Sequence, residues 1–238
     1  MKVHDMTPRY LGAAFLGVIV TSLVSGVATE AAIGPASSIS DTLANAATNA
    51  GTLRIAVLAG LCNAVGILIL ATLLYVVLEG QGRTLAIVAL LCWVGEAIFY
   101  ALNQVAVSGL IRLGSDYVAA GAPVGSFHET LGQFLYHDVY ELGGTILMFF
   151  YCAGGLLWYS LFYRSRYVPR PLALFGLAAV TLGLLGAGIE LLGTRLQMLP
   201  YLAIGVFELA IGVLLVVRGI DEGHGSRSSV SAPAPAGR

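Results

Sequence analysis

Apolar residues fill six long stretches of this chain, and shorter polar segments separate them. Each stretch has about 20 residues, the length that an α-helix needs to cross the hydrocarbon core of a bilayer. Because backbone polar groups inside a bilayer must be satisfied within the protein, each stretch is predicted to be a helix. The sequence therefore predicts an all-α membrane bundle with six transmembrane helices, at about residues 10–28, 54–78, 85–105, 138–163, 171–192 and 199–217.

The first long connection, residues 29–53, is expected to contain a helix. Ile39, Leu43 and the alanines that follow recur at helical spacing after Pro35 and a run of serines. This pattern predicts a helix that starts near Asp41 and runs directly into the second span.

The second long connection, residues 106–137, is expected to be a loop that ends in a helix. Ser126 followed three positions later by Glu129 is the capping-box pattern of a helix start, which makes capping the simplest role for Glu129. The fourth helix is therefore predicted to begin outside the membrane, or to bend onto its surface near Gly132.

The composition agrees with a membrane setting. Hydrophobic residues make up 58% of the chain and charged residues 11%, whereas a soluble domain carries about 25% charged residues. The net charge of −1 implies no bulk electrostatic partner, and we find no nucleotide, phosphate or nucleic-acid motif, so nucleic acid is not an expected partner. The three cysteines all fall inside predicted helices, where they are interpreted as packing residues.

The basic residues give the expected orientation, because lysine and arginine gather in cytoplasmic loops. With the N-terminus placed inside, nine of them lie on the inner side: Lys2, Arg9, Arg83, Arg164, Arg166, Arg170, Arg218, Arg227 and Arg238. Three lie on the outer side: Arg54, Arg112 and Arg195. Both termini are therefore predicted to be cytoplasmic. The first apolar run is longer than the 7–15 residues usual in a signal peptide, so it is interpreted as a membrane helix.

The chain is expected to form one six-helix domain over residues 1–219. The remaining segment, residues 220–238, is rich in Ser, Ala, Pro and Gly and is expected to be a disordered cytoplasmic tail.

Polar side chains inside the predicted spans are the candidate functional residues, because a charge at a helix centre costs about 2.5–3.5 kcal/mol on insertion scales. At 1.5 Å per residue, all the embedded carboxylates fall at mid-membrane depth or further out. They are expected to share a water-accessible, outward-facing pocket, whose candidate residues are His137, Glu141, Glu208, Glu96, Asn63, Tyr100, Asn103 and Glu190.

His137 and Glu141 are four residues apart and therefore lie on one helix face. Glu141 falls about one turn inside the bilayer, where a carboxylate needs a partner, and His137 is the simplest partner.

Structural roles compete with this interpretation. Glu190 could be an interfacial carboxylate paired with Arg195. Glu96 and Glu208 could hydrogen-bond each other or Asn63 and serve only to hold helices together.

Three segments carry a resemblance to a known family. They are "GLCNAVGILILATLLYVVL" in the second span, "SRYVPRPLALFGLAAV" between the fourth and fifth, and "LPYLAIGVFELAIGVLLVVRG" in the last. Together with the six-span layout, they resemble the bacterial membrane family catalogued as domain of unknown function 4386, over about residues 8–219. The resemblance implies this topology and a plasma-membrane location. It implies no activity and no site residues.

The function that the residues favour is binding or sensing of a small or amphipathic molecule, such as a lipid-like ligand, in the outward-facing pocket, with membrane lipid as a surrounding partner. One alternative is an intramembrane enzyme that uses its carboxylates, either with Glu96 or Glu208 as an acid or with a divalent metal held by His137 and Glu141. A continuous helix would keep His128 about 13 Å from His137, too far to share an ion unless the helix kinks near Gly132. A proton-coupled transporter and a purely structural role are further alternatives.

Overall fold

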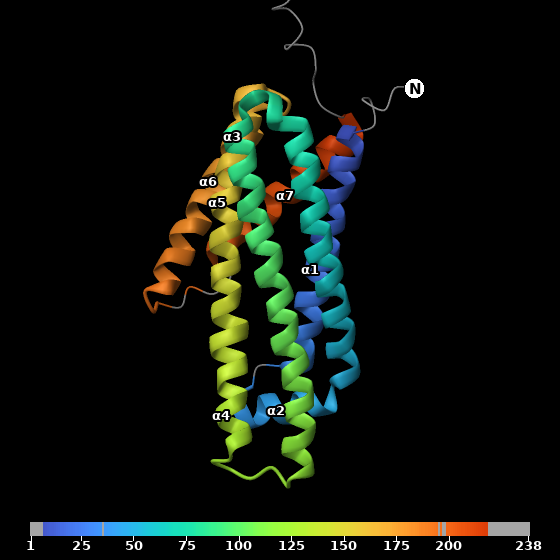
Figure 1. The fold of residues 1–238 in the computed structure, drawn as a ribbon, viewed down its shortest axis with the longest axis vertical. Helices are drawn as coiled ribbons and strands as arrows, with labels where there is room; N and C mark the ends of the chain where they lie inside the picture. Colours follow the sequence, from blue (N-terminus) through green and yellow to red (C-terminus); the bar gives the residue numbers. More distant parts are fainter. Residues whose placement is uncertain (1–6, 35, 195, 197–198, 219–238) are drawn as a thin grey trace, which may run out of the picture.

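The structure is a computed structural model, which describes residues 7–34, 36–194, 196 and 199–218 (Figure 1). The tail predicted to be disordered, residues 220–238, lies outside the described residues. All the regular elements in the described part of the chain are helical: α1 (Thr7–Ile33), α2 (Ile39–Thr48), α3 (Ala50–Ala119), α4 (Phe127–Gln133), the π-helix η2 (Phe134–Glu141), α5 (Leu142–Ser165), α6 (Arg170–Leu191), the 3-10 helix η3 (Leu199–Tyr201) and α7 (Leu202–Arg218).

The longest element, α3, is a hairpin of two helical legs. Its backbone leaves helical geometry at Gly82, where φ is 164° and ψ is 82°. Figure 1 shows the chain reversing direction there, so that the two legs run antiparallel. The predicted second and third spans, residues 54–78 and 85–105, each fall within one leg.

Within the described part of the chain, four helices are long and apolar enough to cross a membrane: Arg9–Ile33, Ala50–Ala119, Phe127–Ser165 and Arg170–Leu191. The second of these is the α3 hairpin, which contains two of the predicted spans. The last predicted span corresponds to α7, which has 17 residues. Each of the six predicted apolar stretches is therefore helical in the structure.

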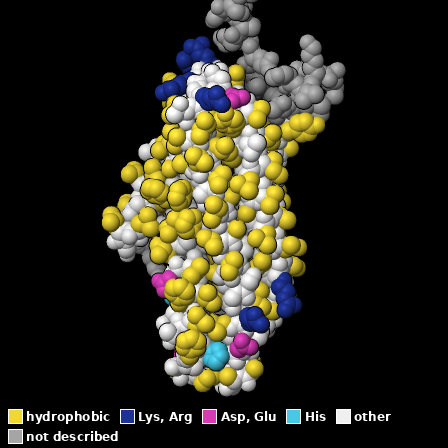
Figure 2. Space-filling view, viewed as in Figure 1, with side chains coloured by type: hydrophobic (Ala, Val, Ile, Leu, Met, Phe, Trp, Pro, Cys, Tyr) yellow, Lys and Arg dark blue, Asp and Glu magenta, His cyan; other side chains and the backbone are white. Residues whose placement is uncertain are grey.

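The outer surface of the bundle is apolar along its middle. Leu58, Leu91 and Val105 are each more than 60% exposed. Figure 2 shows hydrophobic side chains across the centre of the visible face, with arginine side chains gathered towards its two ends. A surface of this kind would be unstable in water over so large an area, and it suits contact with lipid.

The main core fills the centre of the bundle with large aromatic side chains, among them Trp93, Trp158, Tyr159 and Phe207. Trp93 donates a hydrogen bond from its indole nitrogen to the backbone oxygen of Tyr151, at 3.1 Å. This packing ties α3, α5 and α7 together.

A second core lies at the end of the bundle that holds α2 (Figure 1). We call this end the cap; it comprises α2, the first turns of α3, residues 106–119, α4 and η2. Leu43 of α2 is fully buried there among Leu53, Leu110 and Ile111. The expectation of a loop over residues 106–119 is therefore wrong: α3 continues to Ala119 because its apolar positions pack on α2.

The first long connection contains the predicted helix, but this helix does not run into the second span. α2 begins at Ile39, two residues before Asp41, and ends at Thr48. The break follows from side-chain bonding, since the amides of Asn45 and Asn49 donate hydrogen bonds to the last carbonyl groups of α1, at 2.7 and 2.9 Å. These bonds turn the chain back against α1.

Hydrogen bonds also fix the start of α2. The hydroxyl groups of Ser37 and Ser38 donate to Oδ2 of Asp41, at 2.7 and 2.8 Å. These hydroxyl donors stabilise the ionised carboxylate and hold the pKa of Asp41 below its usual value.

Glu129 joins three elements of the cap. Its carboxylate accepts hydrogen bonds from the backbone N–H of Gly125 at 2.6 Å, the hydroxyl of Tyr117 at 3.2 Å and the hydroxyl of Ser40. The capping-box prediction is confirmed in part, because Ser126 is the N-cap residue but its side chain makes no capping bond.

The predicted bend near Gly132 is wrong. The helix from Phe127 to Ser165 is continuous, and Gly132 instead packs closely against Ile39 and Leu43 of α2. The alternative expectation, a fourth helix that starts before the predicted span at residue 138, matches this geometry.

Candidate functional site

A π-helix carries the first two candidate residues. In η2, His137 and Glu141 lie on one face, and Nδ1 of His137 is 2.7 Å from Oε2 of Glu141. The predicted partnership between these two side chains is therefore confirmed. Their side chains are 44% and 34% exposed, so both can meet solvent or a ligand. π-helical segments occur frequently at functional sites.

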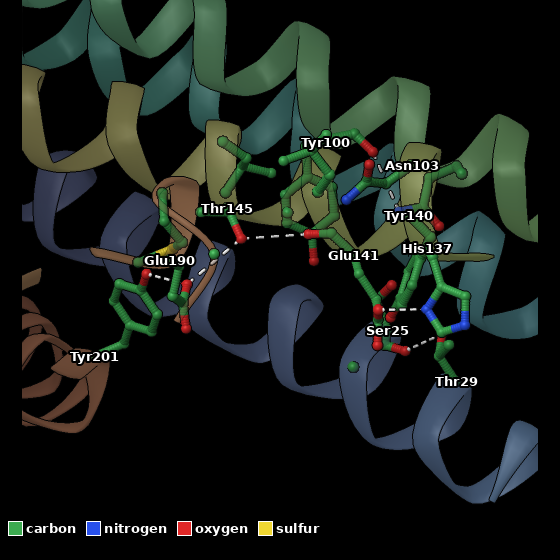
Figure 3. A pocket seen from close by; sticks show the side chains of 17 residues that line it. Ser25, Thr29, Tyr100, Asn103, His137, Tyr140, Glu141, Thr145, Glu190 and Tyr201 are labelled. Atoms are coloured by element: carbon green, nitrogen blue, oxygen red, sulfur yellow. Dashed lines mark hydrogen bonds and ion pairs between the residues drawn. The ribbon is translucent and has the colours of Figure 1, made fainter. Parts of the chain in front are cut away.

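Five of the eight candidate residues line one cavity of about 670 Å³. The cavity lies between α1, α3, η2, α5 and the turn from α6 to α7 (Figure 3). The candidates that line it are Tyr100, Asn103, His137, Glu141 and Glu190.

Glu190 is held by hydroxyl groups at one side of this larger cavity. Tyr201 donates a hydrogen bond to Oε2 of Glu190 at 2.9 Å, and Thr145 donates to the same oxygen at 3.4 Å (Figure 3). Arg195, the partner considered for Glu190, lies outside the described residues.

The wall formed by α3 carries two unsatisfied amide oxygens. Oδ1 of Asn103 and Oε1 of Gln104 are buried without a hydrogen-bond partner, in side chains only 8% and 5% exposed. Nε2 of Gln104 donates to the backbone oxygen of Tyr100 at 3.2 Å, which fixes the orientation of the Gln104 amide. Buried polar groups of this kind are usually paired, so the unpaired oxygens mark a place where a donor is missing.

The other three candidates line a smaller cavity of about 210 Å³, which lies deeper in the bundle. These are Asn63, Glu96 and Glu208. Tyr100, Leu147 and Met148 line both cavities, so the two cavities adjoin. All eight candidate residues thus border these two adjoining cavities.

The polar residues of the smaller cavity do not make the hydrogen bonds that the structural alternative expects, in which Glu96 and Glu208 bond each other or Asn63. Glu208 accepts a hydrogen bond from the hydroxyl of Tyr151 at 2.7 Å, and Asn63 accepts one from Thr21 at 2.8 Å. Oε2 of Glu96 is buried and has no hydrogen-bond partner. Glu96 therefore keeps one buried carboxyl oxygen without a partner.

The continuous helix keeps His128 away from the site. His128 packs near the ring of Tyr117 in the cap, with ring centroids 6.3 Å apart. The kink that would have brought His128 to His137 does not form. Among the described residues, no group of three or more His, Cys, Asp or Glu side chains is arranged to hold a metal ion.

Several lining residues were not among the sequence candidates. Ser25 and Thr29 come from α1, and Tyr140, Thr145 and Tyr201 come from η2, α5 and η3. Gln104 directly follows the candidate Asn103, and that adjacency was the available signal. Hydroxyl residues are common on helix surfaces, so only the packing of the helices shows which of them face a cavity.

These features define a class of protein: an apolar helical bundle with helices that can cross a membrane, and a polar region of carboxylate, amide and hydroxyl groups near one end. The family model described as "Domain of unknown function (DUF4386)" matches residues 10–219, and the chain belongs to this family. No curated protein and no solved structure matches the chain.

Proposed function

We propose that this chain is a six-span membrane protein that binds or senses a small or amphipathic molecule in the two adjoining cavities, which we propose are connected. The observation that carries the proposal is the convergence of eight polar residues on two adjoining cavities, seven of them from five predicted spans and His137 from the position just before the fourth span. Membrane-embedded polar groups are costly, and they are typically found where they bind a ligand or ion. The cavities combine such groups with apolar walls, which is typical of small-molecule sites.

In the proposed orientation, both termini lie in the cytoplasm and the larger cavity opens to the outside of the cell. The Gly82 kink, the α5–α6 connection and the end of α7 lie at one end of the bundle, opposite the cap (Figure 1). Arg83, Arg164, Arg166, Arg170 and Arg218 belong to that end, which is consistent with the positive-inside rule. A bacterial plasma membrane is the setting that this arrangement and the family favour.

Two fusions test the orientation. A reporter active only outside the cytoplasm should be silent when joined after Arg218 and active when inserted at Gly121. The reverse pattern would overturn the proposed topology.

Thiol labelling tests whether the larger cavity is open to water. Gly26 borders the cavity, whereas Gly17 lies on the same helix, borders neither cavity, and is exposed on the apolar surface. A Cys added at either position meets open space. In a background without the native cysteines, an impermeant thiol reagent applied from outside should label Gly26→Cys and leave Gly17→Cys unlabelled. Equal protection of both would contradict a water-accessible cavity.

A second candidate function is proton handling, as in an intramembrane acid catalyst or a proton-coupled transporter. It is favoured by a chain of hydrogen-bonded groups, since Tyr151 bonds both Glu208 at 2.7 Å and the hydroxyl of Tyr159 at 3.0 Å. Such a chain can pass a proton between its members. In proteoliposomes under an outside-acid gradient, proton uptake that disappears in Glu208→Gln would support this role.

A further inference from the structure

We propose that the connected cavities take a protonated amine carried on an apolar body. This inference rests on the proposed binding function and adds the chemical class of the ligand. It follows from the charge of the lining, from the unpaired atoms in it, and from its apolar walls.

Among the described lining residues, acidic side chains outnumber basic ones. The described residues that line the two cavities include the carboxylates of Glu141, Glu190, Glu96 and Glu208 and no lysine or arginine. The only basic side chain among them is His137, and it is already bonded to Glu141. An anionic ligand would meet repulsion here, whereas a cation would be attracted.

Three lining residues also carry a buried oxygen atom that has no hydrogen-bond partner. The three atoms are Oδ1 of Asn103, Oε1 of Gln104 and Oε2 of Glu96, and each side chain is more than nine-tenths buried. A carboxylate or ether ligand would bring more acceptors and leave these oxygens unsatisfied. As packed, these oxygens are closed off from the cavity, so a ligand reaches them only after their side chains turn. A primary ammonium group brings three N–H donors for them, and its positive charge suits the carboxylates of Glu141 and Glu190 in the larger cavity.

The apolar part of the ligand also has a place. Leu147 and Met148 line both cavities, and the smaller cavity is further walled by Ile67, Trp93 and Ile204. These side chains can pack against a short hydrocarbon chain. An ammonium head among the acceptors with its chain along this wall would satisfy both halves of the lining.

Binding of matched eight-carbon probes tests the inference. The full chain is reconstituted in phosphatidylcholine nanodiscs, whose lipid has no N–H donor, and titrated with octylamine, octanol or octanoate. Trp93 borders the smaller cavity, so quenching of tryptophan fluorescence reports occupancy, and the melting temperature gives a second readout. Octylamine should bind at least about tenfold more tightly than either other probe, the factor that one charge-assisted hydrogen bond supplies.

Variants locate the binding. Glu190→Gln should weaken octylamine binding about tenfold, whereas Glu79→Gln, an exposed carboxylate far from both cavities, should not. Gly26→Leu should obstruct the larger cavity, and Gly17→Leu is the matched control on the same helix. Equal effects of Glu190→Gln and Glu79→Gln would overturn the inference.

The outcomes separate the ligand class from the binding function. Octanol or octanoate binding as tightly as octylamine, and blocked by Gly26→Leu, would overturn the amine class while leaving the cavities as a binding site. Absence of binding by all three probes would also overturn the amine class, and the thiol-labelling result would then decide the binding function separately. Nanodiscs with phosphatidylethanolamine identify the source: competition with octylamine would indicate a lipid amine head group, and no competition a free amine.

Discussion

The His137–Glu141 pair offers a test in which two substitutions have opposite expected effects. His137 occupies an acceptor oxygen of Glu141 at 2.7 Å and competes with any amine for it. His137→Ala should therefore strengthen octylamine binding, because it removes the side chain that is bonded to that oxygen. Glu141→Gln should weaken binding, because it removes a charged acceptor from the cavity lining.

The structure sets the size of both effects. Because the two side chains are 44% and 34% exposed, the pair should contribute less than about 1 kcal/mol to folding. For a chain of this length, that corresponds to a fall in melting temperature of less than about 4 °C. A hydrogen bond to a charged group contributes about 1.5–3 kcal/mol, so Glu141→Gln should raise the Kd for octylamine by about tenfold or more.

The melting temperature and the Kd for octylamine can be measured on the same nanodisc samples, the first by circular dichroism during heating and the second by fluorescence titration. The reasoning would be refuted if His137→Ala weakened octylamine binding as much as Glu141→Gln does. A large loss of melting temperature with unchanged binding in both variants would show instead that the pair only stabilises the helix.

Three further predictions concern stability. A Cβ at Gly12 would lie 2.6 Å from a backbone nitrogen of α7, whereas one at Gly17 meets nothing within 4 Å. Gly12→Ala should therefore destabilise the folded protein by about 1–3 kcal/mol, and Gly17→Ala should stabilise it by up to about 1 kcal/mol. Equal melting temperatures of the two variants would contradict this packing. Tyr151→Phe removes the donor to Glu208 and should cost about 1–3 kcal/mol, measured as a lower melting temperature; an unchanged value would mean that water replaces the hydroxyl. Hydroxyl donors lower the pKa of Asp41 from 3.8, so its ionised form stabilises the fold above about pH 4, and this contribution is lost as the pH falls further. The melting temperature of the wild type should therefore exceed that of Asp41→Asn at pH 7. The difference between the two melting temperatures should shrink at pH 3.

The candidate residues could be identified from the sequence, because a carboxylate or amide within an apolar run can be recognised without knowing how the helices pack. Glu96, Glu141 and Glu208 could each be placed roughly by depth from the rise of a helix. Their partners could not be predicted in this way. Tyr151 and Tyr201 look like packing or interfacial aromatics in the sequence, and only the structure shows that they donate to Glu208 and Glu190.

The sequence by itself determined the helical segments, because a run of apolar residues must satisfy its backbone hydrogen bonds locally, and that requirement depends on no other part of the chain. The tertiary structure decided what depends on contacts between distant segments. It extended α3 to Ala119 because α2 packs against that stretch, and it kept the helix continuous through Gly132, which packs against Leu43. It also divided the polar residues between two adjoining cavities, since the cavities exist only where helices from separate parts of the chain fail to fill the space between them.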